Sequence, residues 1–213
     1  MTDESGDEFV LQKSNTERDL GIHIDCCLNF SEHIYKITHK ANSILAVIRR
    51  TFTQLDCQCF TLLFKSLVRP HLEYGMPMSF PFKMKDIEKV EKVQRRETEQ
   101  VKSLRGLSYE QRLKKLNLPT LKYRRHHGDM IEVYKILHGI YDTDISQGIL
   151  QLAQDNRTRD HFLKLVTQHS KTEIRKKLFL CQSSETFVVS SRNIQTFESR
   201  LNKAWENQPV RFC

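Results

Sequence analysis

The sequence predicts a mainly α-helical protein, an irregular helical bundle with a short N-terminal β-strand or hairpin and a weakly ordered C-terminal tail. Only seven glycines and five prolines occur among 213 residues, which leaves little material for hairpins and glycine-rich loops. Long stretches carry apolar residues at spacings of three and four, and the apolar share of 38% suffices for a modest core. We expect three regions: a disordered or edge-strand N-terminus at 1–16, a helical region at 17–142, and a polar tail with local helices at 143–213.

The first predicted element is a strand over Asp19–Asp25. Leu20, Ile22 and Ile24 alternate there with small or polar neighbours, which is typical of a half-buried strand. The segment Phe9–Gln12 is the candidate partner strand. We therefore expect a small strand pair ahead of the helices.

Two amphipathic helices are predicted next. The first begins at Ser31, a residue type that caps helix N-termini, and ends at the basic pair Arg49–Arg50. The second follows Asp56 and ends where Pro70 interrupts the hydrogen-bond ladder. The first helix has the apolar positions Ile34, Ile37, Ala41, Ile44, Leu45 and Ile48, and the second has Phe60, Leu63, Phe64, Leu67 and Val68. A loop is marked by Gly75, Pro77 and Pro81.

The third predicted helix runs from Asp86 to about Leu104 and has two distinct faces. At 100° per residue its apolar side contains Ile87, Val90, Val93, Val101 and Leu104. The opposite side carries four cations over a rise of about 16 Å, here called the basic row: Lys85, Lys89, Lys92 and Arg96. Glu97 falls on the apolar side, where an unpaired carboxylate would cost several kcal/mol, so we expect it to be paired, exposed or loosely packed.

The net charge of +8 is concentrated around this helix. Residues 83–125 contain fourteen lysines and arginines against six acidic residues, and the rest of the chain is balanced. This distribution favours an anionic partner for the central segment more than the total charge alone would.

Three further helices complete the prediction. A short one starts at Ser108, with Gln111 in the capping-box position, and a longer one runs from Thr120 to near Gly139. In the tail, Ile194–Trp205 has the best apolar face.

Several kinds of site are disfavoured by the sequence. The six cysteines show no C-x-x-C pair and no finger-like histidine spacing, which predicts reduced thiols and no zinc site. Adjacent His126 and His127 diverge by about 100° on a helix, so a structural role is favoured over metal binding. Asp142 and Asp144 fit a helix-terminating turn better than a metal pair. Neither a Gly-x-Ser-x-Gly elbow nor a phosphate-cradling glycine loop is present.

We expect no secretory signal, transit peptide or membrane span in this sequence. The first eight residues are acidic, unlike a secretory signal or transit peptide, and no apolar run approaches the roughly 20 residues needed to cross a bilayer. We expect an intracellular protein of the nucleus or cytoplasm that makes no membrane contact.

Five segments occur in the order ERDLGIHID, NFSEHIYKITHKANSILAVIRR, LFKSLVRPHLEYG, KDIEKVEKVQRRETEQV and LSYEQRLKKLNLPTLKYRRHHGDMIEVYKILHGIYD. Together they resemble the region after the catalytic palm in reverse transcriptases of non-LTR (LINE-type) retrotransposons. The similarity covers Glu17 to Asp142 and continues more weakly in RKKLF and NIQTFESRLNKAWENQPVRF. In that family this region corresponds to the thumb, whose helices hold the template–primer duplex by its backbone, while two-metal phosphoryl transfer takes place in the palm.

The resemblance implies part of such an enzyme without its chemistry. The family holds two divalent ions with a Tyr/Phe-Ala-Asp-Asp turn and a further upstream Asp, and this sequence has no Asp-Asp dipeptide. Ser79 stands where the family often has Trp, and Glu97 where its helix usually has a small apolar residue. We expect a catalytically incompetent fragment of an RNA-directed DNA polymerase, with no catalytic residue, metal or cofactor.

The resemblance also implies a partner for the central segment. The candidate nucleic-acid-binding residues are Lys85, Lys89, Lys92, Arg96, Arg124 and Arg125, and the expected ligand is RNA or RNA–DNA duplex, bound weakly and without sequence preference. The segment Lys122–Asp129 mixes Arg124, Arg125, His126 and His127 with Tyr123, a combination that could stack on a base or neutralise a phosphate. Composition alone favours a solvated helix face. Two alternatives stand beside this: a helical interaction module that binds a protein partner or self-associates through the apolar faces of 34–48 and 60–68, and a non-functional retrotransposon relic.

Overall fold

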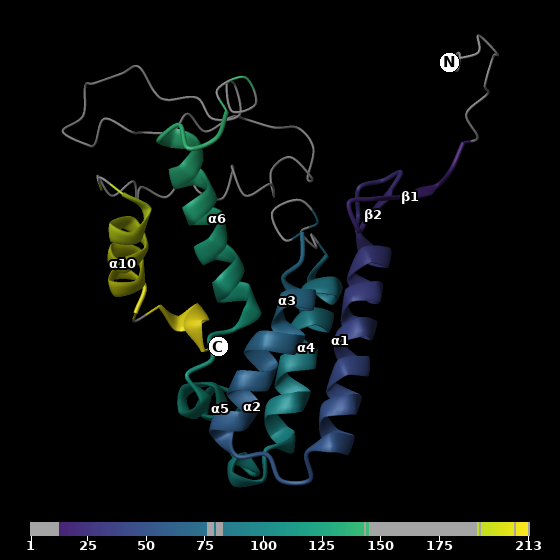
Figure 1. Ribbon diagram of the computed structural model, residues 1–213, viewed down its shortest axis with the longest axis vertical. Helices are drawn as coiled ribbons and strands as arrows, with labels where there is room; N and C mark the ends of the chain where they lie inside the picture. Colours follow the sequence, from purple (N-terminus) through teal and green to yellow (C-terminus); the bar gives the residue numbers. More distant parts are fainter. Residues whose placement is uncertain are drawn as a thin grey trace.

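Helices make up most of the part of the chain that the computed structural model describes, which is residues 13–75, 79, 83–142, 144, 191, 193–206 and 208–212. Figure 1 shows their arrangement. In chain order the elements are β1 (Thr16–Asp19), β2 (Ile22–Asp25), α1 (Ser31–Thr51), α2 (Cys57–Leu63), the π-helical turn η1 (Phe64–Val68), α3 (Arg69–Leu72), α4 (Met84–Gln100), the 3-10 turn η2 (Lys102–Leu104), α5 (Tyr109–Leu116), α6 (Leu121–Leu137), α10 (Ile194–Ala204) and the 3-10 turn η3 (Pro209–Arg211). This confirms the predicted fold class, mainly helical with a short N-terminal hairpin.

The N-terminal strands form an antiparallel hairpin with a two-residue turn. Leu20 and Gly21 both have positive φ, 46° and 83°, which is the backbone that a tight hairpin turn requires. The predicted strand Asp19–Asp25 is therefore wrong as a continuous element, because the chain reverses at this turn and β1 pairs with β2. The candidate partner Phe9–Gln12 lies outside the described residues.

Helix α1 begins differently from the prediction. The carboxylate of Asp25 accepts hydrogen bonds from the backbone amides of Asn29 (3.1 Å) and Phe30 (2.8 Å), and Phe30 has a left-handed φ of 55°. Ser31 does not cap the helix. Its hydroxyl instead donates to Oδ2 of Asp86 at 2.7 Å, because Asp25 already holds the preceding turn and α4 supplies a buried acceptor.

Pro70 does not end the second helix. The π turn η1 precedes it, and the amide of Arg69 bonds to the carbonyl of Phe64, five residues back, so that the helical path continues through α3 to Leu72. The buried residues of this path are spaced by four: Phe60, Phe64, Val68 and Leu72. Leu67, predicted on the apolar face, is 46% exposed because the wider turn changes which side faces the core.

Three helix starts agree with the sequence. The Asp56 carboxylate accepts from the amide of Cys59, and the Thr120 hydroxyl accepts from the amide of Tyr123 at 3.0 Å. Ser108 and Gln111 form the predicted capping box before α5. Helix α4, in contrast, starts at Met84 and stops at Gln100, where the extended Val101 separates it from η2.

The buried residues form two clusters. The larger one joins α1, α2, η1, α3, α4, η2 and α5, and it contains the apolar faces predicted for residues 34–48 and 60–68 except for Leu67. Apart from Leu67, those faces, considered from the sequence as a surface for a partner, are therefore covered within the chain. In the smaller cluster α10 packs on α6, beside which it lies in Figure 1, through Met130, Tyr134, Phe197 and Leu201. Residues 145–190 of the predicted tail lie outside the described residues.

Candidate nucleic-acid interface

The four cations of the basic row lie together on one exposed side of α4. Lys85, Lys89, Lys92 and Arg96 are all exposed, while Val90, about 100–160° from each of them around the helix, is buried. Their spacing of four, three and four keeps them within about 60° around the helix axis. The structure therefore confirms that these four residues share a face.

Helices α1 and α4 run side by side in the same direction. The Ser31 hydroxyl bonds to Asp86 at 2.7 Å, and farther along both helices Nη2 of Arg96 donates to Oδ1 of Asn42 at 2.7 Å. From the first contact to the second the residue numbers increase on both helices, so α1 and α4 are parallel. We call the solvent-facing line between these two contacts the α1–α4 seam. The basic row forms its α4 side.

Two buried carboxylates lie beneath the row. Asp86 is fully buried and bonds to Nζ of Lys89 at 2.8 Å, and Glu97 is 1% exposed and bonds to Nη2 of Arg49 at 3.1 Å and Nε of Arg96 at 3.3 Å. Burial disfavours the ionised form of Asp86, but its bonds to Lys89 and Ser31 outweigh this and lower its pKa. Of the three outcomes expected for Glu97, the structure shows that it is paired.

These ion pairs divide the basic row into two kinds of cation. Lys89 and Arg96 each share their charge with a buried acid. Within the described residues no ion pair involves Lys85 or Lys92, so their charges are the most available to an anion. The exposed Glu88 lies about 80° from Arg96 around the helix, on the edge away from α1.

Arg124 and Arg125, the other two candidates, do not extend the basic row. Both guanidinium edges of Arg124 bond to the carboxylate of Glu73, one of them at 2.8 Å. Arg125 is 6% exposed and lies 3.7 Å from the carboxylate of Asp129, and burial lowers its pKa to about 10. Their charges serve contacts inside the protein.

The aromatic and histidine residues of the same segment are also structural. Tyr123 is 6% exposed and packs edge-on against Trp205 at 5.9 Å, so its ring does not face solvent for stacking. Burial, with help from the nearby Arg125 and Lys122, lowers the pKa of His126 to about 4. No group of three potential metal ligands occurs within the described ranges.

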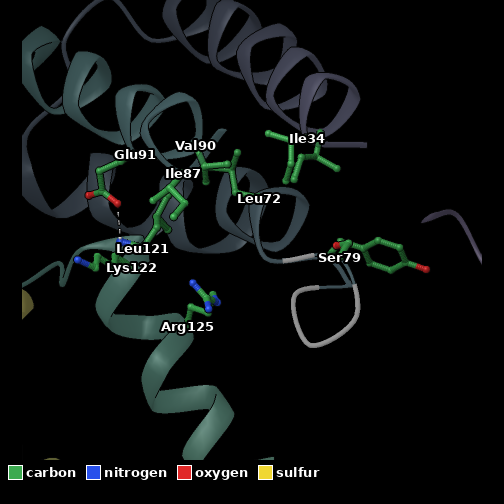
Figure 2. Close-up of a pocket in the computed structure, with 11 residues that line it drawn as sticks. Ile34, Leu72, Ser79, Ile87, Val90, Glu91, Leu121, Lys122 and Arg125 are labelled. Atoms are coloured by element: carbon green, nitrogen blue, oxygen red, sulfur yellow. Dashed lines mark hydrogen bonds between the residues drawn. The ribbon is translucent and has the colours of Figure 1, made fainter. Parts of the chain in front are cut away.

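An apolar pocket between α1, α3, α4 and α6 holds a half-buried carboxylate at its edge (Figure 2). Glu91 accepts from the amide of Leu121 at 3.0 Å, shown as a dashed line, and from the hydroxyl of Tyr109. Burial raises the pKa values of Glu91 and Tyr109. Because both oxygens of Glu91 join α4 to α5 and α6, the group stabilises the helix packing.

Sequence reasoning missed an exposed aromatic pair on α1. Tyr35 is 63% exposed, and its ring centre lies 6.0 Å from that of His39, which is also exposed. Tyr35 lies about 20° around the helix from Asn42, the residue that contacts Arg96, which places it at the α1 side of the seam. A wheel projection of α1 identifies Tyr35 as an aromatic residue off the apolar stripe, but not its neighbour on α4.

The chain is partly similar to a known protein. The chain is 28% identical over 129 residues to an uncharacterized protein of Caenorhabditis elegans, a match that covers 59% of this chain and 63% of that protein. The chain thus spans less than two thirds of this relative. No protein-family model and no solved structure matches. Among the described helices none has the length and hydropathy to span a membrane.

Proposed function

We propose that this protein binds the backbone of nucleic acids without sequence preference, as a thumb-like helical module similar to that of LINE-type reverse transcriptases. The observation that supports the proposal most is the basic row, four exposed cations on one side of α4. We expect the protein to act in the nucleus or cytoplasm, where such ligands occur.

The row has dimensions that suit a sugar–phosphate chain. Its cations follow one another at about 4.5–6 Å of helix rise, and the whole row covers about 16 Å. Each phosphate neutralised by such a cation releases counterions and contributes about 0.7–0.9 to the salt slope of log K. Since Lys89 and Arg96 are partly neutralised by Asp86 and Glu97, we expect a modest affinity that falls steeply with salt.

In this proposal the chain binds nucleic acid but does not polymerise it. Two-metal phosphoryl transfer needs paired carboxylates, and the sequence has no Asp-Asp dipeptide that resembles the family's turn. The purified protein should therefore extend no primer with Mg²⁺ or Mn²⁺, and robust extension would contradict this part of the proposal.

The binding test compares two double variants of equal charge change. Lys85→Glu with Lys92→Glu reverses the two cations of the row that form no ion pair within the described residues, whereas Lys65→Glu with Lys115→Glu reverses exposed cations on η1 and α5. Binding of labelled RNA and RNA–DNA duplex is measured by fluorescence anisotropy at about 50 mM and about 150 mM salt, two concentrations at which charges are screened to different extents. Circular dichroism confirms that each variant is folded.

We expect the row variant to lose about tenfold or more in affinity at low salt and to reduce the salt slope by about 2. The control variant should change both much less. Absence of binding by the wild-type protein at low salt, or equal losses in the two variants, would refute the proposal.

A further inference from the structure

We propose that the α1–α4 seam is a site for single-stranded nucleic acid, in which Tyr35 stacks on an unpaired base while the basic row holds the adjoining phosphates. This inference rests on the proposed function and specifies its ligand. It adds a residue that lies on a different helix from the row and outside the central basic segment.

The position of Tyr35 follows from the two contacts that bracket the seam. Tyr35 precedes Asn42 by seven residues, and Lys89 precedes Arg96 by seven, which is about 10.5 Å of rise on each helix. Because α1 and α4 run in parallel and Asn42 contacts Arg96 at 2.7 Å, Tyr35 lies level with Lys89. Counting forward from the Ser31–Asp86 contact gives the same level within one residue.

Both residues face solvent at the edge of their helices that adjoins the seam. Seven residues are close to two helical turns, so Tyr35 keeps the direction of Asn42, and Lys89 keeps that of Arg96, to within about 20°. Tyr35 is 63% exposed and Lys89 has a side chain 48% exposed. An exposed aromatic ring and a row of cations thus lie beside one another on a single surface.

This combination fits a single strand better than a duplex. In a duplex the bases are stacked on each other, and a side chain reaches only their edges or the backbone. An unpaired base exposes its π-face, and proteins that bind single strands combine such stacking with a positively charged track for the phosphates. The ring of the exposed His39 lies 6.0 Å from that of Tyr35, on the side of Tyr35 away from Asn42.

The test uses the full chain and three tyrosine variants. Tyr35→Ala removes the ring, Tyr35→Phe keeps it without the hydroxyl, and Tyr141→Ala removes another exposed tyrosine beyond the end of α6. Each is titrated with a labelled single-stranded oligouridylate and with an RNA–DNA duplex of equal length. In parallel, an oligonucleotide with 5-iodouracil is photocrosslinked to the wild-type protein and the modified peptide is identified by mass spectrometry.

We expect Tyr35→Ala to weaken single-strand binding by about five- to a hundredfold and to leave duplex binding unchanged. Tyr35→Phe and Tyr141→Ala should bind like the wild type. The crosslink should fall on Tyr35.

Equal binding of single strands by Tyr35→Ala and the wild type, or equal weakening of single-strand and duplex binding, overturns the inference. If the Lys85 and Lys92 reversal still weakens binding in either case, the proposed function is unaffected. If neither the tyrosine nor the lysine variants change binding, both are refuted.

Discussion

Replacing Glu97 by glutamine should weaken the fold and strengthen nucleic-acid binding at the same time. The Glu97 side chain is 2% exposed and joins Arg49 of α1 to Arg96 of the basic row. Glutamine has nearly the same shape and can still accept a hydrogen bond, but it removes the negative charge. The substitution therefore changes the electrostatics of the seam with little change in packing.

The loss of stability can be bounded from the exposure of the three groups. Breaking a fully buried ion pair by changing one partner costs about 3–5 kcal/mol. Arg49 and Arg96 have side chains 40% and 49% exposed, so water replaces part of what they lose. We expect the free energy of unfolding to fall by about 1–3 kcal/mol.

The effect on binding has the opposite sign. Without the carboxylate, the guanidinium of Arg96 is no longer neutralised from below, and the row gains one net positive charge. The affinity for single-stranded RNA at low salt should rise by a few-fold, with a salt slope steeper by up to about 0.7.

Urea unfolding followed by circular dichroism measures the first effect, and a double-mutant cycle with Arg49→Met isolates the ion pair. We expect a coupling energy of about 0.5–2 kcal/mol between positions 49 and 97. A coupling below about 0.3 kcal/mol, or an affinity that falls together with stability, would refute the electrostatic account of the seam.

Two further predictions concern stability alone. Because the pKa of His126 is lowered to about 4, the unfolded chain binds a proton between pH 6.5 and 4 that the folded chain does not, and wild-type stability should fall as the pH is lowered through this range. The variant His126→Gln should lack this loss, about 1 kcal/mol at pH 5 after allowance for partial exposure, and identical pH profiles in urea titrations would contradict the assignment. Gly75→Ala should cost about 1–3 kcal/mol, because φ is +67° and the new Cβ would lie 2.7 Å from Cδ1 of Ile22, whereas Gly106→Ala, with φ +80° and no atom within 4 Å, should cost less in the same assay.

The features that the sequence predicted correctly depend mainly on neighbouring residues. A cap such as Asp56 or Thr120 needs only an amide three residues ahead, and the basic row needs only the helical repeat. The strand expected over Asp19–Asp25 is divided in the structure because Leu20 and Gly21 form the hairpin turn, which alternation of apolar residues does not indicate.

The features that the sequence could not predict depend on which distant groups meet. Glu97 looked unsuitable for a buried helix face because its partner Arg49 lies 48 residues away. Arg124 belonged to a basic cluster in the sequence, yet Glu73, 51 residues away, binds its guanidinium. The continuation through Pro70 required a π turn, which no local propensity indicates. The proximity of Tyr35 to the basic row likewise depends on the packing of α1 beside α4.

The parallel arrangement of α1 and α4 links any ligand of the seam to the folding of the chain. Ser31 and Asp86 are 55 residues apart in sequence, so their contact closes a long loop at an entropic cost of about 3–4 kcal/mol or more. Such non-local contacts raise the contact order and tend to form after local helices. A nucleic-acid strand bound to both Tyr35 and Lys89 would connect the two helices non-covalently and so stabilise the closed loop. Its binding should therefore slow amide hydrogen exchange along both helices, including turns that it does not touch.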